Sequence, residues 1–96
     1  MITRYRKANH VVERQVRDKL ILVPMRTGPA RLDALYTLNE TAAFLWQQLG
    51  TLQTEDALVA GLMMNYSLAE TTAKPDVRHF LDALLAIGAV NQSEQD

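Results

Sequence analysis

The sequence predicts an α+β fold, in which a three-stranded antiparallel sheet is followed by three helices. Two observations lead to this prediction. Segments rich in β-branched residues come before residue 39, and after it the apolar residues recur at the three- and four-residue spacing of helices. Strands gathered at one end of a chain and helices at the other are typical of α+β domains. A small antiparallel sheet beside three helices is close to a winged helix-turn-helix architecture.

Three segments are predicted to form the strands. Residues 10–16 carry three valines and alternate loosely between polar and apolar. Residues 19–25 are the clearest strand, because Pro24 stands near its end, where a missing N–H donor matters least. In residues 31–38, every second side chain is Leu, Ala, Tyr and Leu, which gives the third strand one apolar face.

The first helix is predicted to begin after Asn39. Asn is a favoured N-cap because its side chain accepts hydrogen bonds from the free N–H groups of the first turn, and Glu40 follows where the helix dipole favours an anion. Apolar residues continue at helical spacing until Gly50, a typical helix end. Phe44 and Trp46 share this spacing, so we expect both to fill the core.

Two further helices are predicted from cap residues and apolar spacing. Thr54 is suited to cap the second helix, which ends near Tyr66. Residues 67–74 are polar and rich in Thr and Ala, so we expect a loop there. Pro75 suits the first turn of the third helix, whose apolar residues recur at helical spacing until Gly88.

One domain is expected at residues 10–90. A chain of 96 residues suits a single domain, and 48% apolar residues can supply a modest core. Residues 1–9 are expected to form a flexible basic arm, and residues 91–96 a disordered tail. No signal peptide is visible, and no apolar run approaches the ~20 residues that cross a bilayer. We therefore expect a cytoplasmic protein without a membrane partner.

Charge is unevenly distributed along the chain. Residues 1–31 hold eight Lys or Arg and two Asp or Glu, a net charge of +6. Residues 32–96 hold two Lys or Arg and nine Asp or Glu, a net charge of −7. Either the two halves attract each other within the fold, or the basic half meets an acidic partner.

The sequence carries no pattern typical of a catalytic or metal site. It has no cysteines, and its four glycines are too scattered for a phosphate-binding loop. His10 and His79 lack the spacing of metal ligands, and the nearby Asp76 and Asp82 make a solvated helix face the simpler interpretation of His79. We therefore expect a binding module and not an enzyme, with no cofactor and no metal.

A free sheet edge is the remaining candidate for a site. A three-stranded sheet has two edges, and the unpaired N–H and C=O groups of an edge can accept an extended peptide as an additional strand. Backbone pairing then supplies affinity, and pockets for alternate side chains supply the register. Residues 31–38 are a good candidate because Leu35, on the outer face, is apolar.

The order of several short motifs resembles one known family. Residues 38–46 read Leu-Asn-Glu-Thr-Ala-Ala-Phe-Leu-Trp, which is similar to the "LN-x-T/S-A-x-x-(I/L)-W" junction of the PqqD-like family. Its members are pyrroloquinoline-quinone synthesis protein D homologues, also called RiPP recognition elements. Residues 20–24 resemble the family's second strand, and residues 76–90 resemble its closing "DV-x-x-FL-x-x-L-x-x-x-G-hydrophobic" segment. The resemblance covers residues 10–90.

This resemblance implies a winged-helix-like domain that binds the leader of a ribosomally made precursor peptide. The leader is expected to add a strand beside the third strand, in a groove against the third helix. The domain then presents the precursor to a modifying enzyme, often a radical S-adenosylmethionine protein. For three of the residues expected to bind the peptide (Ala34, Tyr36 and Leu81), simple core packing is an equal alternative. The expected peptide-binding residues are Asp33, Ala34, Leu35, Tyr36 and Thr37 from the strand, and Arg78, Leu81, Asp82 and Leu85 from the helix.

A winged-helix DNA-binding regulator is the alternative function. The architecture and the basic N-terminal half favour it. The third helix argues against it, because it carries Asp76, Asp82 and many apolar residues where a recognition helix needs cationic and amide side chains. A homodimer formed through a free strand edge also stays open.

Overall fold

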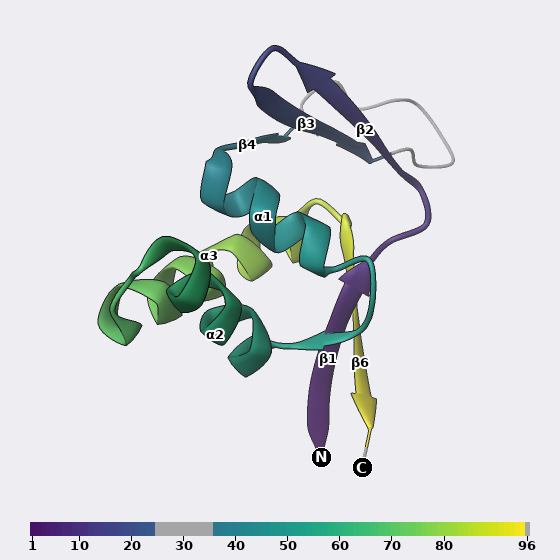
Figure 1. Ribbon diagram of the computed structural model, residues 1–96. Coiled ribbons are helices and arrows are strands. Elements are labelled where there is room, and N and C mark those ends of the chain that lie inside the picture. Colours follow the sequence, from purple (N-terminus) through teal and green to yellow (C-terminus); the bar gives the residue numbers. More distant parts are fainter. Residues whose placement is uncertain (25–35, 96) are drawn as a thin grey trace.

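The structure is a computed structural model that describes residues 1–24 and 36–95 (Figure 1). The described strands form two antiparallel three-stranded sheets, ordered β5-β1-β6 and β2-β3-β4, and three helices accompany them. The predicted α+β class is therefore confirmed. In chain order the elements are β1 (Ile2–Lys7), β2 (Val11–Val16), β3 (Lys19–Pro24), β4 (Tyr36–Leu38), α1 (Glu40–Gln48), β5 (Gln53–Thr54), α2 (Glu55–Tyr66), α3 (Glu70–Ala86) and β6 (Val90–Gln95).

The β2-β3-β4 sheet contains the predicted strands as far as they are described. β2 pairs with β3 over the full length of both strands. On the other side of β3, Leu20 stands opposite Leu38 and Leu22 stands opposite Tyr36. Residues 31–35 of the predicted third strand lie outside the described part of the chain. Since β3 is central, β2 and β4 are the edges of this sheet.

The β5-β1-β6 sheet shows that the predicted arm and tail are wrong. β1 and β6 pair along six positions. Five of these pairs join the expected flexible arm (residues 1–9) to the described part of the expected disordered tail (residues 91–96). Tyr5 of β1 and Val90 of β6 are buried, and this burial helps to offset the conformational entropy lost on ordering the two segments. The two strands lie at opposite ends of the sequence, so neither segment reveals its partner.

Two of the three predicted helix starts are confirmed. The N–H group of Ala42 donates to the side-chain oxygen of Asn39 at 2.9 Å, which caps α1. The N–H group of Ala57 donates to the hydroxyl of Thr54 at 3.1 Å, which caps α2. Each bond satisfies one of the N–H groups that a helix start otherwise leaves without a partner.

The predicted start of the third helix is wrong, because α3 begins at Glu70 and Pro75 lies inside it. Most of the expected loop at residues 67–74 is therefore helical. A proline in a helix removes one hydrogen bond and crowds the preceding turn. Here Ala73 is fully buried and continues the apolar stripe of the helix, and Lys74 pairs with Glu70 one turn earlier at 3.2 Å. Tertiary burial outweighs the local preference against the helix.

The core gathers side chains from all three helices and both sheets. Trp46 of α1 is 1% exposed, as predicted for a core residue. Phe44 is half-buried, and its ring meets that of Tyr66 edge-on at a centroid distance of 5.6 Å. Figure 1 shows the β2-β3-β4 sheet above α1, while β1 and β6 form a ribbon that extends below it. None of the helices in the described chain is long and apolar enough to span a membrane.

A cluster of three side chains joins the two sheets to α1. The indole N–H of Trp46 donates to the carboxylate of Glu13 on β2. The ammonium group of Lys7 on β1 donates to the same carboxylate at 2.9 Å and lies 4.8 Å from the centre of the Trp46 ring. Partial burial alone would raise the pKa of Glu13, but the hydrogen bonds from Lys7 and Trp46 and the charge of Lys7 outweigh it and lower this pKa.

Candidate functional site

A hollow of about 200 Å³ lies between β4, the start of α1 and the middle of α3. Its floor is apolar and its rim is polar, a combination that suits binding of an apolar side chain with a polar neighbour. The apolar residues that line it are Ala42, Leu45, Leu62 and Phe80. The polar residues that line it are Tyr36, Asn39, Thr41, Asp76 and His79.

β4 supplies one wall of this hollow and is also an edge strand of its sheet. Among the described strands only β3 pairs with it, so its other side faces no strand there. Along β4, Tyr36 is half-buried, Thr37 is exposed and Leu38 is buried. Because side chains alternate along a strand, Tyr36 and Leu38 share the face that carries the hollow, and Thr37 points to the opposite face.

α3 supplies the opposite wall through Asp76, His79 and Phe80. The spacing of these residues, at three and four positions, places them on one side of the helix. Asp76 and His79 are exposed, whereas Phe80 is 4% exposed and belongs to the core. The solvated surface predicted for His79 is therefore the rim of a hollow.

Arg78 and Asp82, both expected to bind a peptide, lie outside this hollow and pair within the domain. Arg78 donates to Glu55 of α2 at 2.7 Å and to Asp82 at 2.7 Å. The pKa of Arg78 is raised, and the largest cause is a hydrogen bond with Tyr5 of β1. Partial burial acts in the opposite direction, but this hydrogen bond and the nearby carboxylates of Asp82 and Glu55 outweigh it. These contacts tie α3 to α2 and to β1.

Leu81 and Leu85 also lie outside the hollow. Leu81 is fully buried, and Leu85 is half-buried against the core. Leu81 therefore packs in the core, the alternative given for it from the sequence. Leu85 stays a prediction for peptide binding. Of the expected strand residues, Tyr36 lines the hollow, Thr37 is its exposed neighbour, and residues 33–35 lie outside the described part of the chain.

Comparison with protein families shows a match to the family described as Coenzyme PQQ synthesis protein D (PqqD) over residues 19–90. The chain belongs to the PqqD family. The matched region includes β3, β4 and all three helices, and so every residue that lines the hollow. β1 and β2 precede the region that matches the PqqD family.

Two solved structures share the fold of this PqqD family member. One is TbiB1 in complex with the TbiA(beta) leader peptide, which has a TM-score of 0.71 and 22% sequence identity to this chain. The aligned region covers 95% of this chain and 99% of the TbiB1 chain. The other is lasso peptide synthetase B1 complexed with the leader peptide, with a TM-score of 0.71 and 22% identity, covering 91% of this chain and 96% of that chain. At this level of identity the similarity establishes the fold. A search of curated proteins found no match.

The peptide-binding residues expected from the sequence of this PqqD family member include none of the residues from α1 and α3 that line the hollow. The sequence predicts a capping role for Asn39 and places Thr41 in the family junction, and both residues also line the hollow. On α3, the expected residues and the observed ones lie on opposite flanks of the apolar stripe. The three- and four-residue spacing of Asp76, His79 and Phe80 was a visible signal, but spacing does not say which flank faces β4.

Proposed function

We propose that this chain binds the leader segment of a ribosomally synthesised precursor peptide as a strand added to β4. The observation that carries the proposal is the edge of β4, which pairs only with β3 among the described strands and lies beside a hollow with an apolar floor. Membership of the PqqD family supports it. So do the two structures of similar fold, each of which is a complex with a leader peptide.

In strand addition, the backbone and the side chains of the bound peptide contribute different properties. Hydrogen bonds from β4 to the added strand supply affinity with little dependence on sequence. Alternate side chains of the added strand, about 7 Å apart, face α3, and one of them fills the hollow over Leu45, Leu62 and Phe80. This side chain fixes the register, because a slip by one residue would turn it to the opposite face.

The chain acts in this proposal as an adaptor without catalytic activity of its own. It holds the leader while the rest of the precursor reaches a modifying enzyme in the cytoplasm, for which a radical S-adenosylmethionine protein is one class. A contact between the basic N-terminal half and an acidic partner, and a homodimer, stay predictions. DNA binding gains no support, because both cations of α3, Lys74 and Arg78, are paired with carboxylates.

Nuclear magnetic resonance titration tests the proposal. The isotope-labelled chain is titrated with synthetic leader peptides of precursors encoded near it, and with scrambled peptides of the same composition as control. We expect amide signals of Tyr36, Thr37 and residues 76–80 to shift, while those around Arg78's partner Glu55 on α2 change little. Shifts confined to β1 and β2 would contradict the proposed groove.

A further inference from the structure

Asp76 occupies a position that its own helix does not explain. A carboxylate in the first turn of a helix is stabilised by the helix dipole, but this effect falls off beyond that turn. Since α3 begins at Glu70, Asp76 lies at the end of the second turn. It is exposed and stands on the rim of the hollow.

Asp76 also differs from the other acidic residues of α3 in its partners. Glu70 pairs with Lys74 at 3.2 Å, and Asp82 pairs with Arg78 at 2.7 Å. Within the described chain, Asp76 has neither an ion-pair partner nor a hydrogen-bond partner. Among residues 1–24 and 36–95, no side chain neutralises its charge, so it is open to a basic group of a bound ligand.

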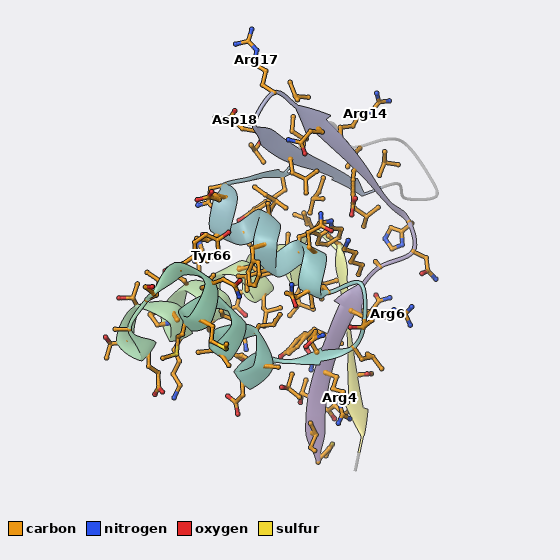
Figure 2. All side chains as sticks on the ribbon, in the orientation of Figure 1. Arg4, Arg6, Arg14, Arg17, Asp18 and Tyr66 are labelled. Carbon is orange, nitrogen blue, oxygen red and sulfur yellow. The ribbon has the colours of Figure 1, made fainter. Side chains whose placement is uncertain are left out.

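In the described part of the chain, the surroundings of the hollow add negative charge and no cation. None of the described residues that line the hollow is Lys or Arg. Glu40, the first residue of α1, stands next to Asn39 on the rim. The described cations lie mostly on the two sheets. Figure 2 shows Arg4 and Arg6 along β1, and Arg14 and Arg17 on the β2–β3 hairpin. None of these four arginines lines the hollow.

We infer that the groove selects a leader segment in which a basic side chain, Lys or Arg, accompanies the apolar side chain that fills the hollow. Asp76 is the residue that determines this preference. The inference rests on the proposed function and specifies its substrate class. Because same-face side chains of a strand recur every second residue, we expect the basic residue two positions from the apolar one.

Peptide selection tests the inference without a known precursor. Random displayed dodecapeptides are selected against the full 96-residue chain, and the bound peptides are sorted by whether they shift the amide signals of Tyr36 and Thr37. The same selection is repeated with Asp76→Asn and with Asp56→Asn. Asp56→Asn removes the same charge from an exposed residue of α2 that does not line the hollow.

Peptides that bind at β4 are expected to be enriched in Lys or Arg two positions from an apolar residue. The enrichment should persist against Asp56→Asn and disappear against Asp76→Asn. Replacing the basic residue of a selected peptide with Gln should weaken its binding about two- to fivefold, the range of exposed ion pairs, and this difference should vanish with Asp76→Asn. Against Asp76→Lys, the selected peptides should carry Asp or Glu instead.

Two results would overturn the inference, and they are distinguishable. Peptides that shift β4 without charge preference, or that keep their preference against Asp76→Asn, would leave strand addition standing and remove the role of Asp76. Selection of peptides that never shift β4 would contradict the proposed function, and the inference would fall with it.

Discussion

Replacing Glu13 with Ala removes the acceptor that Trp46 uses in the core. Trp46 is 1% exposed, and the Glu13 carboxylate is the acceptor of its indole N–H. Glu13→Gln is the matched control, because the amide oxygen can still accept this hydrogen bond while the charge that pairs with Lys7 is lost. The two variants thus separate the hydrogen bond from the ion pair.

The structure sets the size of the two effects. A hydrogen bond to a charged acceptor contributes about 1.5–3 kcal/mol, and we expect Glu13→Ala to lower the free energy of unfolding by this amount. The side chains of Lys7 and Glu13 are 23% and 38% exposed, so solvent screens their attraction and the ion pair contributes about 0.2–1 kcal/mol. Glu13→Gln should therefore cost only this smaller amount.

Urea unfolding followed by tryptophan fluorescence measures both variants, because Trp46 is the single tryptophan of the chain. Since the folded pKa of Glu13 lies below its ordinary value of 4.5, its contribution is fully present above that pH. It is lost as the pH falls through the folded pKa, so the stability difference between Glu13→Gln and the parent should shrink in acid. Equal destabilisation by Glu13→Ala and Glu13→Gln at neutral pH would refute this account of the hydrogen bond.

Three further substitutions test the assignments of core, helix and cap. Leu81→Ala should cost about 2–5 kcal/mol of stability, because Leu81 is fully buried. The fraction of this variant that stays folded should bind peptide as tightly as the parent, and weaker binding would place Leu81 in the groove. Gly61→Ala should stabilise the chain by roughly 0.5–1 kcal/mol, because the added methyl group would stand 3.6 Å from the Phe44 ring without a clash; a loss of stability in thermal unfolding would contradict this fit. Thr54→Ala should cost about 1 kcal/mol through loss of the α2 cap, with peptide affinity unchanged in calorimetry.

The junction from β4 to α1 was predictable because its signals are local. The Asn39 cap needs only its own side chain and the next turn of backbone, and the spacing of Trp46 marks the buried face of α1. The start of α3 was not predictable in this way. Pro75 is a local signal for a helix start, and it is overridden by burial of Ala73 in the core.

The second sheet and the position of the groove also depend on long-range contacts. Neither β1 nor β6 has an apolar pattern strong enough to predict a strand alone, because each is completed by pairing with the other. Helical spacing places the polar residues of α3 on two flanks of its apolar stripe, but it does not say which flank lines the groove. The packing against α2 and β1 that Arg78 mediates decides which flank is left for Asp76 and His79.

Alternate N-methylation of a bound leader peptide tests strand addition to β4 most directly. In an added strand, every second N–H group points toward β4 and the others point away, so two versions of the peptide are methylated on the two alternating sets. Each lost hydrogen bond costs about 0.5–1.5 kcal/mol. We expect one version to bind at least about tenfold more weakly than the unmodified peptide and the other to bind nearly as well. Equal affinity of the two versions would contradict strand addition.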